Sequence, residues 1–307
     1  MTKSILITGG AGLVGSNLTR LALQKGMRVS VLDNLENGDM KYLQNLDITF
    51  FNSDVLCKRD LKSVFKGHDL VVHLAAMGNV LQSIEDPISN FKTNVMGTIN
   101  VLQACRDSEI KKIVFSSTGG ALMGNTLPPV DENSLPDPIS PYGASKLACE
   151  GYIKAFSVSF GIKYTIFRFG NVLGPNCRHK VGVINRFYKQ VKNSEDLNVY
   201  GNVTRDFIFV DDLNDAILNS LNSKDAENQI FHLASGIETD IFEIAKKVEV
   251  LLGRKKSRIK LRTARLGEVE RNFANISKAK KLLGLTNSKT CMEAVEEVIN
   301  YLENEID

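Results

Sequence analysis

The segment SPYGASKLACE carries a tyrosine and a lysine, Tyr142 and Lys146, four residues apart on an expected helix. That spacing puts both side chains on one helix face, where an ammonium beside a phenol favours the phenolate and lowers the tyrosine pKa. Tyr142 could then serve as a general base. An upstream strand ends in the hydroxyl residues Ser116, Ser117 and Thr118, which could donate to the substrate oxygen that the tyrosine deprotonates. Taken alone, the pair also fits a surface tyrosine and lysine on an ordinary helix.

Three glycines spaced three residues apart, Gly9, Gly12 and Gly15, follow an apolar run in the segment ILITGGAGLVG. Glycine lets a strand turn sharply into a helix, and it leaves the helix N-terminus open to a phosphate. The apolar run 29–32 then ends in Asp33, where a carboxylate can accept hydrogen bonds from ribose hydroxyls. The strand, the helix and the acid together favour dinucleotide binding over a tightly packed turn.

These residues need a scaffold that brings them together, and the chain predicts a parallel sheet. Strand-like runs alternate with helical patterns, which is typical of a doubly wound α/β fold. We expect strands at 5–7, 29–32, 48–52, 70–74, 113–116, 164–169, 207–210 and 229–233. We expect helices at 86–107, 141–160, 241–252 and 291–302, the second opened by Ser140 as its cap and Pro141 at its first position.

The composition is that of an ordinary soluble globular protein, with 307 residues, 43% hydrophobic and 24% charged. A net charge of +3 spread along the chain gives no reason to expect a nucleic acid or a membrane as partner. We expect a cytoplasmic protein, because no apolar run could span a bilayer and no signal peptide precedes the first strand. The five cysteines lack metal-ligand spacing, so we expect reduced thiols and no metal site.

The chain resembles the extended short-chain dehydrogenase/reductases, specifically the NAD-dependent nucleotide-sugar epimerase/dehydratase family, and most of all its UDP-hexose 4-epimerases. The segments that carry the resemblance are TGGAGLVG, VLDN, SDV, HLAA, NVMGT, SPYGASK, FRFGNVLGP, RDFIFVDD and ARLGEVER. It implies a Rossmann-type NAD-binding domain over 1–170 with a return segment at about 205–235. A smaller, interleaved C-terminal substrate-binding domain would take up most of 171–307.

The resemblance also assigns roles to individual residues. The catalytic residues would be Thr118, Tyr142 and Lys146. The NAD-binding residues would be Gly9, Gly12, Leu13, Val14, Gly15, Asp33, Asn34, Asp54, Val55, Leu74, Ala75, Ala76, Asn94, Ser116, Tyr142 and Lys146. The substrate-binding residues would be Thr118, Tyr142, Asn171, Tyr200, Arg205, Arg265, Glu268 and Asn272. We expect NAD and not NADP, because Asp33 would repel a 2′-phosphate and no Lys or Arg directly follows it.

The implied activity is 4-epimerisation of a UDP-hexose or a UDP-N-acetylhexosamine through a transient 4-keto sugar. Asn272 stands where a large tyrosine in related epimerases would leave little room for an acetamido group, so we expect N-acetylated substrates to be accepted. The alternatives are a 4-reductase, a dehydratase, or a non-catalytic nucleotide-sensing protein on the same fold. Gly119 and Gly120 after Thr118 argue against the dehydratases, which carry Asp-Glu there.

Three residues depart from the family pattern, Met123, Phe209 and Glu268, and we expect each to lie on the substrate side. The two long helices, near 86–107 and 141–160, are apolar over a wide arc. A helix of that kind packs on more than one neighbour, so we expect a homodimer through this pair.

Overall fold

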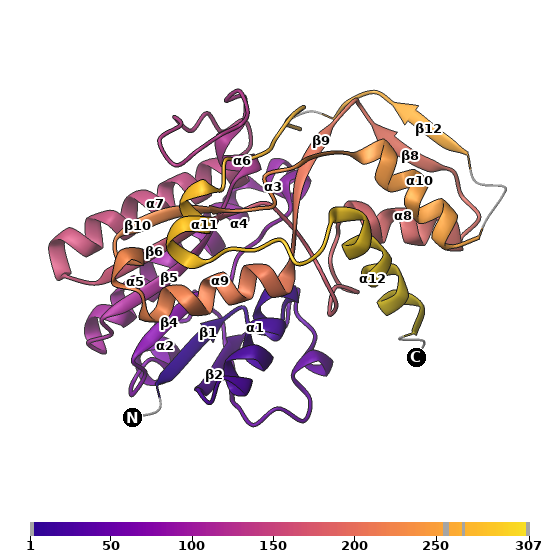
Figure 1. Ribbon diagram of the computed structural model, residues 1–307. Helices are drawn as coiled ribbons and strands as arrows, with labels where there is room; N and C mark the ends of the chain where they lie inside the picture. The colour runs from indigo at the N-terminus through magenta and orange to yellow at the C-terminus, as the bar shows by residue number, and fades with distance from the viewer. Residues whose placement is uncertain (1–2, 254–257, 266–267, 305–307) are drawn as a thin grey trace.

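A computed structural model describes residues 3–253, 258–265 and 268–304 of the chain. At its centre lies a seven-stranded sheet in which every neighbouring pair is parallel, with the order β10-β6-β5-β4-β1-β2-β3 (Figure 1). Its strands are β1 (Ser4–Thr8), β2 (Arg28–Asp33), β3 (Thr49–Asn52), β4 (Leu70–His73), β5 (Lys112–Thr118), β6 (Lys163–Phe169) and β10 (Gln229–Leu233). The doubly wound, Rossmann-type sheet predicted from the sequence is therefore confirmed.

Helices cover both faces of this sheet, because alternate residues of each strand point to opposite sides. In β1, Ile5 and Ile7 belong to one buried apolar cluster and Leu6 belongs to the other. The first cluster includes residues of α1 (Leu13–Gln24) and α9 (Val210–Asn222), and the second includes residues of α2 (Lys58–Val64), α5 (Gly97–Asp107) and α7 (Pro141–Phe160). The shorter helices of this part are η1 (Met40–Leu43), α3 (Val80–Glu85), α4 (Pro87–Phe91), α6 (Gly120–Met123) and η3 (Lys224–Ala226).

The predicted helix at 141–160 is confirmed, together with its cap. The hydroxyl of Ser140 accepts a hydrogen bond from the backbone N–H of Gly143 at 3.2 Å, and Pro141 occupies the first helical position. At the other end, Gly161 has a φ of +71°, the left-handed conformation that commonly ends a helix. The start of α7 is thus fixed one residue before Tyr142.

The single helix predicted over 86–107 is wrong in detail. The segment consists of α4, a π-helical turn η2 (Lys92–Met96) and then α5. The wider turn places the side-chain amide of Asn94 against the backbone of Met77, whose N–H and C=O it bonds at 2.8 and 3.1 Å. A π-helical turn inside a helical segment is often found at functional sites.

The C-terminal part of the chain builds two small sheets, with the orders β11-β9-β7 and β12-β8, and a group of helices beside them (Figure 1). Its strands are β7 (Asn171–Leu173), β8 (Leu197–Tyr200), β9 (Thr204–Phe209), β11 (Glu238–Asp240) and β12 (Ile259–Arg262), and its helices are α8 (Val183–Lys192), α10 (Ile241–Leu251), α11 (Ser277–Leu283) and α12 (Cys291–Asn304). The chain returns to the large sheet through β10. The division into domains over 1–170 and 171–307 stays a prediction.

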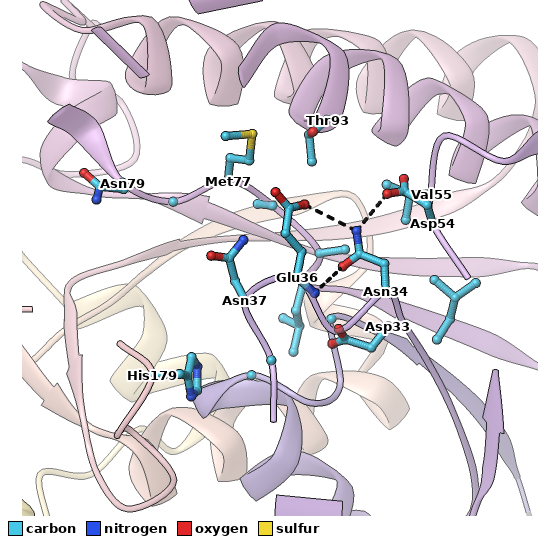
Figure 2. Close-up of a pocket in the computed structure, with 18 of the residues that line it drawn as sticks. Asp33, Asn34, Glu36, Asn37, Asp54, Val55, Met77, Asn79, Thr93 and His179 are labelled. Atoms are coloured by element: carbon cyan, nitrogen blue, oxygen red, sulfur yellow. Dashed lines mark hydrogen bonds between the residues drawn. The ribbon is translucent and has the colours of Figure 1, made fainter. Parts of the chain in front are cut away.

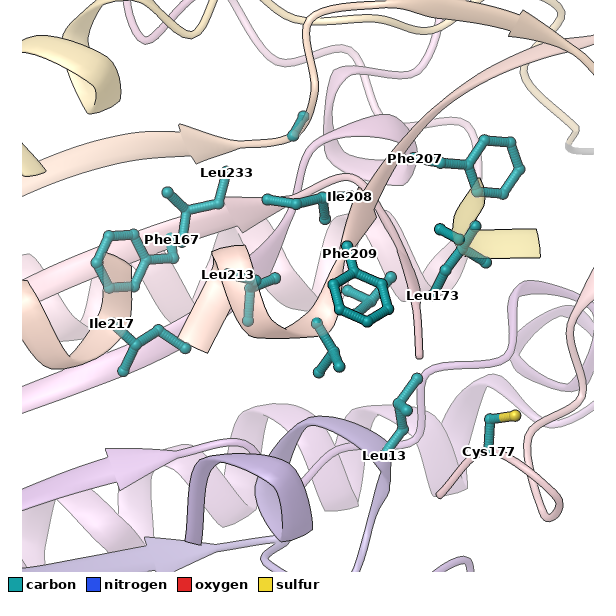
Figure 3. Close-up of a cluster of buried hydrophobic side chains, with 14 of the residues drawn as sticks. Leu13, Phe167, Leu173, Cys177, Phe207, Ile208, Phe209, Leu213, Ile217 and Leu233 are labelled. Carbon is teal, nitrogen blue, oxygen red and sulfur yellow. The ribbon is translucent and has the colours of Figure 1, made fainter. Parts of the chain in front are cut away.

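Two of the residues that depart from the family pattern lie in the core. Met123 is fully buried and Phe209 is almost so, and both belong to the larger apolar cluster, where Phe209 packs among the residues shown in Figure 3. Neither side chain carries a group that needs water or a polar partner, and both contribute apolar surface to the core. Their place on the substrate side stays a prediction.

Within the described ranges, no helix is long and apolar enough to cross a membrane. Over the same residues, no group of three or more His, Cys, Asp or Glu side chains is placed to hold a metal ion.

Candidate active site

The glycine-rich turn joins β1 to α1 in a space too tight for side chains. Gly9 has a φ of +72°, and a Cβ on it would lie 2.7 Å from the backbone nitrogen of Ala75. A Cβ on Gly15 would lie only 2.3 Å from the carbonyl oxygen of Gly9, so this glycine lets α1 dock against the turn. Gly12 is the N-cap of α1, is partly exposed and lines a cleft. The helix N-terminus is therefore exposed, as phosphate binding requires.

Asp33, at the end of β2, holds the turn in place. One carboxylate oxygen accepts from the backbone N–H of Ala11 at 2.9 Å, and the other accepts from that of Leu35 at 2.8 Å. Next to it, the side-chain amide of Asn34 donates to Asp54 at 2.8 Å (Figure 2). The end of β2 is thus rigid and acidic.

A cleft of about 330 Å³ opens along the carboxyl ends of β1, β2 and β4. Of the predicted NAD-binding residues, the cleft is lined by Gly9, Gly12, Asp33, Asn34, Asp54, Val55, Leu74, Ala75 and Ala76. Sequence reasoning missed further lining residues: Leu32, Glu36, Asn37, Gly38, Ser53, Met77, Gly78, Asn79, Gln82, Thr93, His179, Lys180 and Val181. Figure 2 labels Glu36, Asn37, Met77, Asn79, Thr93 and His179 of this set. The cleft has the position in which an open α/β sheet binds its ligand.

The other predicted NAD-binding residues do not line this cleft: Leu13, Val14, Gly15, Asn94, Ser116, Tyr142 and Lys146. Asn94 lies behind the wall, where its amide bonds Met77 and also donates to the hydroxyl of Ser145 on α7 at 2.9 Å. Ser116 donates to the carbonyl of His73 on β4 at 3.2 Å. These two side chains position the wall of the cleft.

Tyr142 and Thr118 meet at one end of the cleft. The hydroxyl of Thr118, at the end of β5, lies close enough to the phenol of Tyr142 to lower its pKa. The phenol oxygen lies 4.0 Å from where a Cβ on Gly78 would be, and Gly78 lines the cleft. A substrate oxygen at this point would reach both hydroxyl groups.

The electrostatics of this pair differ from the sequence expectation. Burial raises the pKa of Tyr142 to about 12, although the hydroxyl of Thr118 opposes that shift. Lys146 donates to the carbonyl of Ser116 at 2.7 Å, and its ammonium lies 5.9 Å from the centre of the Tyr142 ring. The predicted lowering of the tyrosine pKa by the lysine is therefore wrong for this arrangement, because the ammonium turns to a carbonyl and burial dominates.

The pKa of Lys146 is shifted as well. Burial lowers it to about 8, and the carboxylate of Glu150 opposes the shift. Its ammonium also lies 4.8 Å from the centre of the Phe115 ring. A lysine whose pKa lies this close to neutral pH is characteristic of a functional site.

The predicted substrate-binding residues gather around the small sheets. Arg265 stacks on the ring of Tyr200, with its guanidinium carbon 3.8 Å from the ring centre. Arg205 donates to the carboxylate of Glu268 at 3.2 Å. Asn171, at the start of β7, is exposed. Residues 266–267, within the segment ARLGEVER, lie outside the described residues.

Sequence reasoning missed a third arginine at this place. Arg186 of α8 lies with its guanidinium carbon 5.4 Å from the centre of the Tyr200 ring. Burial and the nearby charge of Arg265 lower its pKa, while Glu268 opposes the shift. Three guanidinium groups and one carboxylate leave this region positively charged, as an anionic ligand requires. No motif in the sequence signals Arg186.

Asn272 lies beside the turn that follows Thr118. It is 6% exposed, and its carbonyl oxygen is 3.2 Å from where a Cβ on Gly120 would be. Its amide nitrogen has no hydrogen-bond partner among the described residues. A buried polar group in this state commonly bonds a ligand or water.

Comparison with known proteins places the chain among sugar-nucleotide enzymes. A model of the NAD dependent epimerase/dehydratase family matches residues 5–234. A protein of Methanocaldococcus jannaschii, provisionally named a UDP-glucose 4-epimerase, is 38% identical over 98% of both chains.

Two solved structures are similar over almost the whole chain. The Thermus thermophilus UDP-glucose 4-epimerase in complex with NAD is 30% identical with a TM-score of 0.92, covering 99% of this chain and 100% of that one. The UDP-N-acetylglucosamine 4-epimerase of Methanobrevibacter ruminantium, in complex with UDP-N-acetylmuramic acid, is 28% identical with a TM-score of 0.90, covering 99% of each chain.

Proposed function

Because the chain belongs to the NAD dependent epimerase/dehydratase family, we propose that it is a UDP-sugar 4-epimerase that uses NAD. The observation that carries this proposal is the meeting of the Tyr142 phenol and the Thr118 hydroxyl at one end of the cleft. Both groups face the place where a sugar hydroxyl can be oxidised and reduced again.

The residues present fit the cofactor. The open N-terminus of α1 suits its diphosphate, and Asp33 suits the adenosine ribose. Glu36 and Asp54 add negative charge to the same wall, which favours NAD over NADP. When bound, NAD supplies a hydride acceptor for C4 of the sugar and a donor for its return, so no reductant is consumed.

The chain's own residues handle the proton of the 4-hydroxyl. Tyr142 takes up this proton in its ionised form and returns it after the hydride comes back to the opposite face of C4. In this arrangement burial raises the pKa of the phenol to about 12. The ionised form that the reaction needs would require the Lys146 ammonium, which here donates to the carbonyl of Ser116, to turn toward the phenol. Thr118 donates to the same substrate oxygen and so holds it in place.

The turn after Thr118 favours epimerisation over elimination. A dehydratase needs an additional acid and base beside the sugar, and the related enzymes carry them at the positions of Gly119 and Gly120. Here a Cβ at Gly119 would lie 3.2 Å from the carbonyl of Phe169, and one at Gly120 would lie 3.2 Å from Asn272. Acidic side chains at these positions would need their neighbours to move.

The uridine diphosphate would bind the positively charged region around Tyr200. We assign Arg205 and Arg265 to the diphosphate, and Arg186 to the same group as a third guanidinium. Asn171 would reach the diphosphate from β7, and Glu268 the uridine ribose. Asn272 would bound the pocket beside the sugar C2, where its free amide suits an acetamido group.

We also propose a homodimer in which α4 and α7 form the interface. Exposed apolar side chains cluster on these helices and on α3, which packs beside α7: Leu81, Ile84, Ile88, Phe91, Tyr152, Val158 and Phe160. An exposed apolar surface on packed neighbouring helices is typical of an interface. The cytoplasmic location stays a prediction.

The test is incubation of the protein with UDP-glucose, UDP-N-acetylglucosamine, and GDP- and dTDP-sugars, with products identified by NMR and mass spectrometry. We expect interconversion of 4-epimers without net formation of NADH. Net consumption of a nicotinamide cofactor would identify a 4-reductase, and nucleotide binding without turnover would identify a sensing protein.

A further inference from the structure

The segment between β7 and α8, residues 174–182, reaches from the substrate side of the molecule into the dinucleotide cleft. Its residues His179, Lys180 and Val181 line the cleft together with Gly9 and Gly12 of the glycine-rich turn. In Figure 2, His179 lies across the cleft from the labelled residues of β2 and its loop. The sequence gives no sign of this approach.

The segment is anchored on the first turns of α1. Asn17 donates to the carbonyl of Pro175 at 3.0 Å, and Asn176 donates to the hydroxyl of Ser16 at 3.1 Å. Leu13, the first residue of α1, and Cys177 belong to the same buried cluster (Figure 3). The segment is therefore held beside the helix N-terminus that faces the cleft.

A second anchor fixes the tip of the segment. The ring of His179 packs on the ring of Tyr42 in η1 with their centres 5.5 Å apart, and its Nδ1 lies 3.4 Å from the Tyr42 hydroxyl. Burial lowers the pKa of His179, so this side chain is neutral near pH 7. The positive charge at the tip comes from the next residue.

Lys180 is the only lysine or arginine among the described residues that line the cleft. Its ammonium donates to the carbonyl of Val172 at 2.5 Å, and no described carboxylate forms an ion pair with it. Burial lowers its pKa to about 8. The ammonium has lost much of its hydration without gaining a counter-charge, and a phosphate would supply that charge.

The glycine-rich turn does not provide a cation of its own. Its side chains at Ala11, Leu13 and Val14 are apolar, so it offers a diphosphate only backbone N–H groups and the dipole of α1. A group with two negative charges is bound more strongly where a cation complements that end of the helix.

We propose that Lys180 binds the diphosphate of the dinucleotide, and that residues 174–182 thereby clamp the cofactor from the substrate-binding side. This inference rests on the proposed NAD cofactor. The chemistry it requires is that of a diphosphate, which the sugar nucleotide also carries, so the experiment separates the two ligands.

The test compares Lys180→Met with the wild type and with Lys189→Met, which removes an exposed lysine of α8. Binding of NAD, ADP, adenosine and UDP is measured by titration calorimetry on protein freed of copurified nucleotide. We expect Lys180→Met to lower the affinity for NAD and ADP by about 10- to 100-fold. The affinity for adenosine and for UDP should not change. Lys189→Met should bind all four ligands as the wild type does, and Lys180→Arg should recover most of the NAD affinity.

Other outcomes overturn the inference. Unchanged NAD binding by Lys180→Met would show that the ammonium is not a cofactor ligand. Weaker UDP binding with normal NAD binding would assign it to the sugar nucleotide. Equal losses for NAD and adenosine would indicate a purely structural role. If Lys180→Met does not fold, Lys180→Gln takes its place in the same titrations. A wild type that binds no NAD at all would instead contradict the proposed function.

Discussion

At the scale of single residues, the chemistry depends on one phenol. Tyr142→Phe keeps the ring and removes the ionisable oxygen that faces the cleft. We expect turnover to fall by at least about 100-fold, the usual effect of losing general acid/base help. NAD binding should be largely retained, because the phenol lies at one end of the cleft and is not among the residues that line it. Steady-state kinetics and NAD titration check both statements.

The matched control is Tyr152→Phe on the same helix, since Tyr152 is 44% exposed and is not among the residues that line the cleft. Its turnover should stay near that of the wild type. Near-normal turnover in Tyr142→Phe would mean that another group is the base.

Asn272 determines which sugars fit, if its place beside Gly120 bounds the substrate pocket. Asn272→Tyr fills that space with a large ring, and steric exclusion has an abrupt effect on specificity. Conversion of UDP-N-acetylglucosamine should be suppressed while conversion of UDP-glucose is spared. The measurement is kcat/KM for both substrates. Equal losses for both, or a wild type without activity on the N-acetylated sugar, would contradict this assignment.

At the scale of elements, the turn between β1 and α1 tolerates no side chain at its third glycine. In Gly15→Ala the new Cβ would lie 2.3 Å from the Gly9 oxygen and 2.6 Å from the Gly10 Cα, and both are backbone atoms that cannot move cheaply. We expect the free energy of unfolding to fall by about 1–3 kcal/mol. NAD affinity should fall as well, because α1 can no longer dock on the turn.

Gly151→Ala provides the contrast within α7. A Cβ at Gly151 meets no atom within 4 Å, and the residue is exposed. Alanine is the better helix former, so the free energy of unfolding of this variant should rise by about 0.5–1 kcal/mol. Urea unfolding measures both variants, and a stable Gly15→Ala with normal NAD binding would show that the turn can widen.

The buried histidine of β4 makes the sheet sensitive to acid. His73 is fully buried between the hydroxyls of Thr8 and Thr98, and burial lowers its pKa from 6.5 to about 3. Its folded-state pKa is depressed, so its contribution to stability is complete above 6.5 and is lost as the pH falls toward 3. The loss is at most about 1.4 kcal/mol per pH unit in that window.

The check is urea unfolding over the same window for the wild type and His73→Gln, which cannot titrate. We expect a shallower decline of stability with falling pH in the variant. His68→Gln, at a partly exposed position, should change the slope less. Parallel slopes for His73→Gln and the wild type would contradict the assignment.

The elements themselves could mostly be predicted from the sequence, because their signals are local. Ser140, Pro141 and Gly161 bound α7, and the apolar run before Asp33 marks the end of β2. The π-helical turn at Lys92–Met96 could not be predicted, since it depends on Asn94 meeting the backbone of Met77 from a different element. A local pattern does not contain that contact.

At the scale of the whole molecule, a part of the site could be predicted where the residues that meet belong to one local motif. Tyr142 and Lys146 share a helix, so their proximity followed from their spacing. Arg186 and Lys180 had no such signal, because each reaches its site only after β7 and α8 are placed against the rest of the chain. The direction of the Lys146 ammonium, toward a carbonyl and away from the phenol, also required coordinates.

The proposed dimer depends on the apolar surface that α4 and α7 expose together. Ile88 and Phe91, three residues apart on α4, are 62% and 50% exposed, and α4 packs beside α7, which carries further exposed apolar residues. The double variant Ile88→Asp/Phe91→Asp would bury two carboxylates in each copy's half of the interface, at a cost that association cannot offset.

In light scattering after gel filtration, the wild type should have the mass of two chains and the variant that of one. Val250→Asp, at a 75% exposed position on α10, should stay dimeric. Because neither Ile88 nor Phe91 lines the dinucleotide cleft, the monomeric variant should still bind NAD. A monomeric wild type, or a double variant that stays dimeric, would rule out this interface.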